Sequence, residues 1–207
     1  MAAIAGGEDS TRERICAAAL TCVARWGIAK TTLEDVAKEA GCGRATIYRT
    51  FRGGKAEVLA AVVTTESDRF RRAVDGAVGA AGNDLEDVVV AGVVAAARFL
   101  DGHTALRFLL AHEPDAVLPW VTFRGLRPLF DAVGQYAHPH LARFLPDPEQ
   151  RARAVEWLAR VVLTYVLNPA DGVDLTDEAD ARHLLRTFVL PGITPRTQEP
   201  SHVLHQR

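Results

Sequence analysis

The stretch TTLEDVAKEAGCGRATIYRTF, residues 31–51, decides the fold of the first quarter of this chain. Apolar residues recur at helical spacing from Leu33 to Ala40, behind a threonine that can cap a helix. Gly41 then stands where the end of a helix favours a left-handed residue. A second short helix is expected over 44–51. Two short helices joined by such a turn predict a helix-turn-helix.

The outward face of this second helix carries groups suited to nucleic acid. It presents Arg44, Ala45, Thr46, Tyr48 and Arg49, which supply donors for phosphate or guanine edges, a methyl group for thymine and a phenolic hydroxyl. The major groove of DNA, about 12 Å wide, admits such a helix. The same pattern also fits two helices that simply pack together, with the arginines solvated and the tyrosine half-buried.

Charge is unevenly distributed along the 207 residues, although the formal net charge is only −2. Residues 11–55 hold nine Lys and Arg against four Asp and Glu, and residues 56–207 hold fifteen against twenty. A basic head on an acidic body favours contact between the head and phosphate groups.

An ordered series of residues over 11–63 resembles the DNA-binding head of the TetR/AcrR family of bacterial regulators. The chain departs from the common family pattern at Gly43, where a serine is frequent, at Thr50, and in a link before Lys55 that is one residue longer. The residues that carry the resemblance are Ile15, Ala19, Trp26, Gly27, Thr31, Thr32, Val36, Ala37, Ala40, Gly41, Ala45, Thr46, Ile47, Tyr48, Phe51, Lys55 and Leu59.

The resemblance implies an all-α protein of about nine helices, in which a three-helix DNA-binding head precedes a helical domain for ligand binding and dimerisation. It implies that Tyr48 and Lys55 touch phosphate and that residues 44–46 and 49 lie nearest the bases. Helix N-termini at Thr32 and Lys55 can also offer amides and charge to phosphates. The predicted DNA-binding residues are Thr31, Thr32, Arg44, Ala45, Thr46, Tyr48, Arg49 and Lys55.

Helical periodicity continues beyond the head, and no alternating strand pattern of useful length appears. Pro114 is expected to stop a helix, Pro128 to kink or break one, and His138-Pro139-His140 to form a turn. Helices are expected over about 11–26, 55–78, 85–100, 104–112, 119–136, 148–167 and 176–190. The predicted organisation is a flexible segment over 1–9, the helix-turn-helix domain over 10–54, the ligand-binding and dimerisation domain over 55–192, and a flexible tail over 193–207.

By the same resemblance, the helices in the middle of the chain surround a ligand cavity. For each of their aromatic residues, including Phe130, a place in ordinary core is the alternative. His103, Arg107, Arg124 and Arg127 are candidate polar anchors, and arginines beside aromatic rings hint at an amphipathic acid as ligand. The predicted ligand-binding residues are Phe99, His103, Phe108, Trp120, Phe123, Arg124, Arg127 and Tyr136.

The last two predicted helices carry wide apolar faces that suggest a partner. A two-fold four-helix bundle would cover them, and the alternative is a core wholly within one chain. The predicted dimer-interface residues are Val155, Leu158, Val162, Leu163, Leu184, Leu185 and Phe188.

Other classes of function find little support in the sequence. Three cysteines and seven histidines follow no metal-ligand spacing, so we expect no metal and no cofactor. Gly53-Gly54-Lys55 lacks the Ser or Thr and the earlier glycine of a phosphate-binding loop, and no nucleophile elbow appears, so we expect no enzyme. No apolar run reaches a membrane span and no secretion signal is recognisable, which predicts a cytoplasmic protein without membrane contact.

These observations together predict a homodimeric DNA-binding regulator of transcription, most simply a repressor released from a palindromic operator by a small apolar or amphipathic ligand. One alternative is a DNA-binding regulator without a small-molecule effector, either an activator or one controlled by a protein partner. Another is a small helical enzyme whose head is vestigial. A cavity inside the body separates the first two hypotheses.

Overall fold

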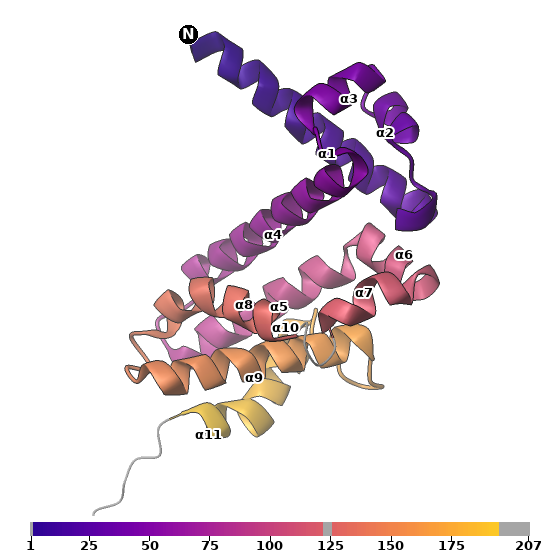
Figure 1. The fold of residues 1–207 in the computed structure, drawn as a ribbon. Helices are drawn as coiled ribbons and strands as arrows, with labels where there is room; N and C mark the ends of the chain where they lie inside the picture. Colours follow the sequence, from indigo (N-terminus) through magenta and orange to yellow (C-terminus); the bar gives the residue numbers. More distant parts are fainter. Residues whose placement is uncertain (1, 122–125, 195–207) are drawn as a thin grey trace, which may run out of the picture.

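The computed structural model describes residues 2–121 and 126–194, with side chains for residues 10–118, 127 and 130–194. A head of three helices stands above a body formed by the others, and the long helix α4 runs from the head down along the body (Figure 1). The helices are α1 (Ala2–Lys30), α2 (Leu33–Glu39), α3 (Arg44–Thr50), α4 (Gly54–Ala80), α5 (Leu85–Asp101), α6 (Thr104–His112), α7 (Pro114–Val121), α8 (Leu126–Leu141), α9 (Pro148–Leu167), α10 (Glu178–Leu184), the π-helix η1 (Leu185–Val189) and α11 (Leu190–Ile193).

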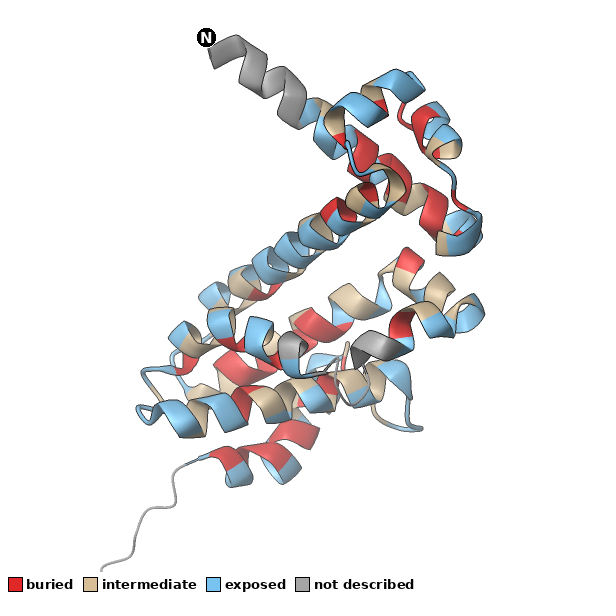
Figure 2. Ribbon diagram, in the orientation of Figure 1, coloured by how far each residue is buried: buried red, intermediate tan, exposed pale blue. Residues whose placement is uncertain are grey.

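Two separate apolar cores hold the head and the body, and Figure 2 displays buried segments in both. In the head, Ile15 of α1, Ile47 of α3 and Phe51 are completely buried. The small residues Ala37 and Ala40 are also buried, which lets α2 lie close to its neighbours. Because α4 contributes to both cores, the domain boundary expected between residues 54 and 55 stays a prediction.

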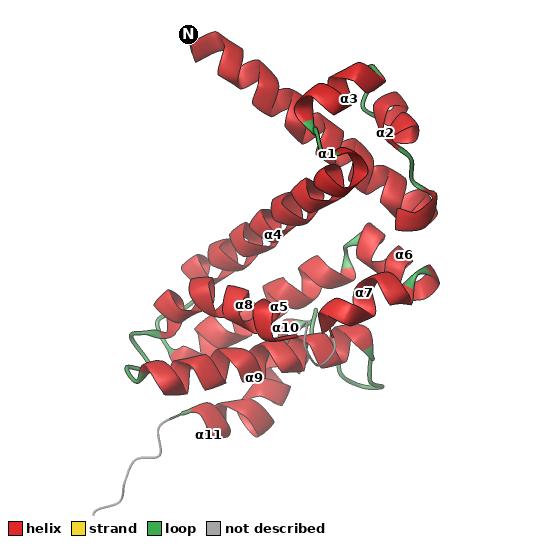
Figure 3. Ribbon diagram, in the orientation of Figure 1, coloured by secondary structure: helices red, strands yellow, loops and turns green. Residues whose placement is uncertain are grey.

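Caps explain why several helices begin where the sequence predicts. Asp84 and Asp147 accept hydrogen bonds from the backbone N–H of Asp87 (2.8 Å) and Glu149 (3.1 Å), at the starts of α5 and α9. Helix α9 has the predicted bounds. The expected all-α class is confirmed for the described residues, which contain no strand (Figure 3).

Several details of the predicted helices differ in the structure. Helix α1 begins at Ala2, well before residue 11, where the predicted helix starts. The expected end of this helix after residue 26 agrees with the structure, because Gly27 has a non-helical backbone (φ 81°, ψ 175°) that separates it from a last turn ending at Lys30. Pro114 starts α7 instead of only stopping α6, which suits a residue whose missing N–H is not needed in the first turn.

The proline pattern of the next segment also differs from the prediction. The helix expected over 119–136 is divided into α7 and α8, and Pro128 falls in the first turn of α8, where proline is tolerated. His138-Pro139-His140 lies inside α8 and forms no turn. The helix expected over 176–190 is divided into α10, η1 and α11.

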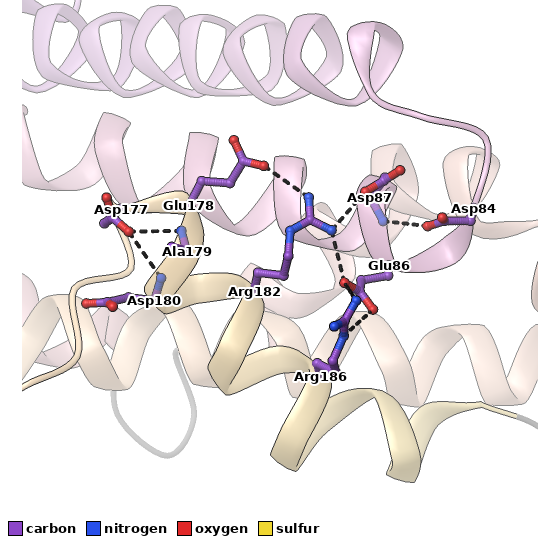
Figure 4. Close-up of polar contacts among 9 residues, drawn as sticks. All are labelled: Asp84, Glu86, Asp87, Asp177, Glu178, Ala179, Asp180, Arg182 and Arg186. Carbon is purple, nitrogen blue, oxygen red and sulfur yellow. Dashed lines mark hydrogen bonds and ion pairs between the residues drawn. The ribbon is translucent and has the colours of Figure 1, made fainter.

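A network of ion pairs fastens the carboxyl-terminal helices to the start of α5 (Figure 4). The guanidinium of Arg182 donates to Glu86 (2.9 Å), Asp87 (2.9 Å) and Glu178 (3.0 Å). Arg186 donates two further hydrogen bonds to Glu86, at 2.7 and 2.9 Å. These bonds lower the pKa of the Glu86 carboxyl, with Arg186 the larger cause and Arg182 the second. The network therefore fixes the position of α10 against α5.

Candidate nucleic-acid interface and effector cavity

Helix α3 presents most of the predicted contact residues to solvent. Arg44, Ala45, Tyr48 and Arg49 are exposed, and Thr46 is half-buried. The Arg44 guanidinium lies 5.8 Å from the centre of the Tyr48 ring, and its hydrogen bond with the tyrosine raises the pKa of Arg44. Ile47, on the opposite side, is completely buried. The helix is thus held by its apolar side and leaves a cationic, aromatic side free.

The turn before α3 depends on a glycine. Gly41 has φ 61°, a left-handed conformation that residues with a Cβ adopt at a cost, and a Cβ there would meet no neighbouring atom. Arg14 secures the preceding helix because its Nε donates to the carbonyl of Ala40 at 3.1 Å. The second helix is therefore aimed by backbone geometry and by a contact from α1.

Two predicted DNA contacts at the start of α2 have internal partners. Thr31 is 2% exposed, and its hydroxyl donates to the carbonyl of Gly27 at 2.6 Å. The prediction that Thr31 contacts DNA is therefore wrong, because burial keeps its side chain from the surface. Thr32 is exposed, but it forms a reciprocal cap with Asp35, whose pKa these hydrogen bonds lower. Thr32 therefore caps the start of α2. Its side chain is exposed, but its hydroxyl is already hydrogen-bonded with Asp35.

Lys55 also has a partner within the chain. Its half-buried ammonium group donates to the carbonyl of Ile28 at 2.6 Å. An ammonium has three donors, so this contact leaves donors for a phosphate. The residue links the start of α4 to the end of α1 in addition to its predicted role.

A cavity of about 500 Å³ lies in the body, beneath the head. Side chains from α4, α5, α6, α8 and α9 line it, and most of them are aliphatic. Leu20, Val23 and Ile28 of α1 also line it, so the cavity reaches the head itself. Its volume falls in the range of small-molecule sites in proteins.

Some of the predicted ligand-binding residues line this cavity and others do not. Phe99, His103 and Tyr136 line it. Phe108 stacks on His112 with ring centres 4.4 Å apart and does not line it. Phe123, Arg124 and the side chain of Trp120 lie outside the described residues. Phe130, for which a place in the core was the alternative to the cavity, is buried, and the guanidinium of Arg160 lies over its ring.

Of the arginines expected as polar anchors, the structure describes Arg107 and Arg127, and neither lines the cavity. Arg127 is 82% exposed and pairs with Asp131 one turn away, because a charged helix residue that faces water finds its partner there. Arg107 is also exposed and does not line the cavity. The prediction of Arg127 as a ligand-binding residue is therefore wrong, and the hint of an acidic ligand loses this support.

The sequence missed three residues that the structure brings to the cavity. Glu66, Phe70 and His140 line it, although helical periodicity alone gives a charged residue on α4 no reason to turn inward. Glu66 lies 3.3 Å from the Nε2 atom of His103, and both side chains are about 15% exposed. His140 lies 2.9 Å from Asp75, which also faces α8. Burial, followed by the charge of Asp75, raises the pKa of Tyr136 above its usual range.

A direct contact joins the body to the bend in α1. The carboxylate of Glu113, between α6 and α7, accepts hydrogen bonds from the backbone N–H of Ile28 (2.8 Å) and Ala29 (3.3 Å). A Cβ on Gly27 would overlap this carboxylate, so the close approach requires the glycine. The end of α6 is thus bonded to the helix that supports the head.

The residues predicted for a dimer interface divide into two groups. Val155, Val162, Leu184 and Leu185 are buried within the chain, and Leu158 and Leu163 line the cavity together with two of them. These six residues are therefore engaged inside one chain, which corrects the prediction for them. Phe188 is 74% exposed, and Trp157 of α9, which the sequence prediction omitted, is 56% exposed. The exposed apolar residues in this part of the chain thus include Trp157 of α9 and Phe188 of η1.

A basic helix-turn-helix followed by a helical body that contains a cavity is typical of DNA-binding regulators of transcription. Residues 15–62 match the family described as bacterial regulatory proteins, tetR family. The HTH-type transcriptional regulator Rv1255c of Mycobacterium tuberculosis (strain ATCC 25618 / H37Rv) is 27% identical over 172 residues, which cover 79% of this chain and 75% of that protein. Residues 15–62 are thus similar to tetR-family regulators, and about four fifths of the chain is similar to an HTH-type transcriptional regulator.

Solved structures share the fold over most of the chain. The TetR family repressor AlkX from Dietzia sp. strain DQ12-45-1b has a TM-score of 0.62 and 21% identity, and the match covers 88% of this chain and 94% of that one. The fatty acid degradation regulator FadR from Bacillus halodurans has a TM-score of 0.58 and 20% identity, with 86% and 96% covered. Within the part of this chain that the structure describes, no single helix is long and apolar enough to cross a membrane, and α5 with α6 meets that criterion only as a pair bent by 63°.

Proposed function

We propose that this regulator is a repressor that binds a palindromic operator as a homodimer and leaves it when a small apolar or amphipathic molecule enters the cavity. The observation that carries the proposal is that residues of α1, a helix of the head, and of α4, which runs from the head, both line the cavity in the body. A ligand in the cavity would therefore contact both helices directly.

The proposed release follows from the way these supports are joined. Helix α4 runs unbroken from the head to the body, and Glu113 and Lys55 both bond the end of α1. A ligand that fits better when α4 is displaced favours a different position of the head. In general such a coupling amounts to about 1–3 kcal/mol, and it requires the ligand to prefer the state that does not bind DNA.

Dimerisation is part of the proposal because one short recognition helix gives limited affinity. Two copies related by a two-fold axis would place their α3 helices in successive major grooves, about 34–36 Å apart. We propose that the second copy covers the exposed aromatic surface of Trp157 and Phe188.

The test of DNA binding compares variants of α3 with a matched control. A pool of random duplexes first yields a bound sequence, and its affinity is then measured against salt concentration. Arg44→Ala and Tyr48→Ala are each expected to weaken binding by about tenfold, because each removes a phosphate or base contact, and Arg44→Ala should also reduce the salt slope because it removes a positive charge. Arg153→Ala, on an exposed face of α9, is the control and should change neither. Unchanged affinity and slope in both α3 variants would exclude this face.

A regulator without a small-molecule effector remains the second candidate, and the cavity favours the first. A filled body would have no room for an effector, whereas this body has a partly open cavity of about 500 Å³. The role proposed here requires binding alone, and we propose no catalytic activity, metal or cofactor for the chain.

A further inference from the structure

The cavity has an unusual distribution of charge for a binding site of this size. Its ionisable lining residues within the described part of the chain are Glu66, His103, Tyr136 and His140, with no lysine or arginine among them. Among the described lining residues, a ligand with a carboxylate or phosphate would therefore find no lysine or arginine side chain to receive it. Burying such an anion without a partner is costly.

The carboxylate of Glu66 is the charged group at the wall of this cavity. Its Oε2 atom lies 3.3 Å from His103, and its Oε1 atom is 3.0 Å from Arg69. Arg69 approaches from the solvent side with 57% of its side chain exposed, so water and salt screen its charge. Glu66 is only 15% exposed and faces the cavity.

The side chain of His103 is held at the start of α6. Its Nδ1 atom accepts the backbone N–H of Leu106 at 3.1 Å. A ring nitrogen that accepts a hydrogen bond carries no proton, so in this arrangement the proton of the ring is on Nε2, the atom that lies 3.3 Å from Glu66. The ring is thus a neutral neighbour of the carboxylate.

Three aromatic rings line the same cavity as this carboxylate. Phe70 follows Glu66 by one turn of α4, and its ring makes edge-to-face pairs with Phe99 (5.4 Å between centres) and Tyr136 (6.3 Å). All three line the cavity. The faces of aromatic rings attract cations, and a group of such rings is a recognised way to bind a quaternary ammonium.

We propose that the cavity selects amphiphilic organic cations, with the ammonium group held between Glu66 and the rings of Phe70, Phe99 and Tyr136 and the hydrocarbon body among the aliphatic side chains of α5 and α9. The inference rests on the proposed role of the cavity as an effector site. It identifies the chemical class of the effector that the proposed function leaves open.

Three probes with the same hydrocarbon chain test the charge preference in the full-length protein. These are decyltrimethylammonium, 1-decanol and decanoate, and calorimetric titration measures their dissociation constants. We expect the cation to bind at least about tenfold more tightly than decanoate, because an aromatic cage and a carboxylate together contribute about 1–2 kcal/mol. Decanoate binding as tightly as the cation, or no binding of any probe, overturns the proposal.

A matched pair of variants then assigns the preference to one residue. Glu66→Gln removes the charge but keeps an acceptor for His103, and it should weaken the cation by about tenfold while leaving 1-decanol unchanged. Asp68→Asn removes a carboxylate from the exposed side of the same helix and should change neither. Equal weakening of both probes by Glu66→Gln contradicts the proposal. The comparison of probes on the unaltered protein still decides it if that variant does not fold.

The effect of each probe on DNA binding separates this inference from the proposed function. A cation that binds the cavity but leaves DNA affinity unchanged supports the ligand class and contradicts the release of the repressor. Decanoate that binds most tightly and releases DNA supports the repressor and overturns the cation selectivity.

Discussion

Glu113 connects the two halves of the molecule through the backbone of α1. Its carboxylate receives two N–H groups just after the bend at Gly27, where the helix would otherwise leave donors unpaired. A hydrogen bond to a charged group contributes about 1.5–3 kcal/mol, and a buried donor left alone costs a similar amount. The contact is therefore strong enough to transmit a shift of α6 to the head.

Replacement of this residue gives a prediction at the scale of one side chain. Glu113→Ala should lower the free energy of unfolding by about 1–2 kcal/mol and reduce the effect of a cavity ligand on DNA affinity, because the bond between α6 and α1 is lost. Denaturant titration and DNA binding with and without decyltrimethylammonium measure the two effects. Asp115→Ala changes an exposed neighbour and should behave like the unaltered protein. If Glu113→Ala retains the full ligand effect, the contact does not couple the halves.

Residues such as Glu113 and Glu66 show where sequence reasoning stops. The face of α3 could be predicted because Ile47 and its polar neighbours follow a local helical pattern. The contact of Glu113 with residue 28 joins positions 85 apart, and no local pattern marks it. Thr31 is a different case: its hydroxyl bonds to Gly27, only four residues away, and its burial depends on how the end of α1 packs.

The ion pairs between α5 and α10 make the packing of these elements depend on pH. The pKa of Glu86 is lower in the folded protein than in the unfolded chain because Arg186 and Arg182 donate to it. Stability from a carboxylate with a depressed pKa is present above the pKa of the unfolded chain, and it is lost as pH falls through the folded value. Carboxylates titrate near pH 4 when unperturbed, so the loss begins as pH falls below about 5.

The corresponding prediction concerns acid unfolding. Glu86→Gln should lower the thermal midpoint by a few degrees at pH 7 and make the midpoint depend less on pH between about pH 5 and 3, because the group that titrates is gone. Thermal denaturation followed by circular dichroism at several pH values measures this. The control is Glu156→Gln, because Glu156 forms an exposed ion pair with Arg160 on the surface of α9. A pH dependence equal to that of the unaltered protein would show that the network does not govern acid stability.

Whole helices were predictable wherever a cap and a periodic apolar face agreed. Helices α5 and α9 meet that condition through Asp84 and Asp147. The end of the chain does not, because η1 inserts a π-turn that the periodicity of residues 184–189 does not reveal. A π-turn shifts the faces of a helix. Leu185 is consequently buried while Phe188 is exposed, and a single apolar face over both was the wrong expectation.

At the scale of the molecule, the exposed aromatic surface predicts the state of assembly. Phe188→Glu should weaken the proposed dimer by at least about tenfold, since the loss of one buried phenylalanine is about 1.5–3 kcal/mol and a charge adds to it. Sedimentation at several concentrations measures the dimer, and DNA affinity should fall in parallel. Thr187→Glu places the same charge on an exposed neighbour and tests whether the ring itself matters. An unchanged dimer in Phe188→Glu would move the interface elsewhere.

The main chain and the side chain of Ile28 make different contacts. Its backbone N–H donates to Glu113, and its carbonyl accepts from Lys55 at the start of α4. Its side chain lines the cavity. Because almost every amino acid has the same backbone groups, exchanges at this position can reshape the ligand site and leave both bonds in place. Proline, which lacks the N–H, is the exception. A lineage of such proteins could therefore adapt to new chemicals at residue 28 while the means of reporting them to DNA stayed the same.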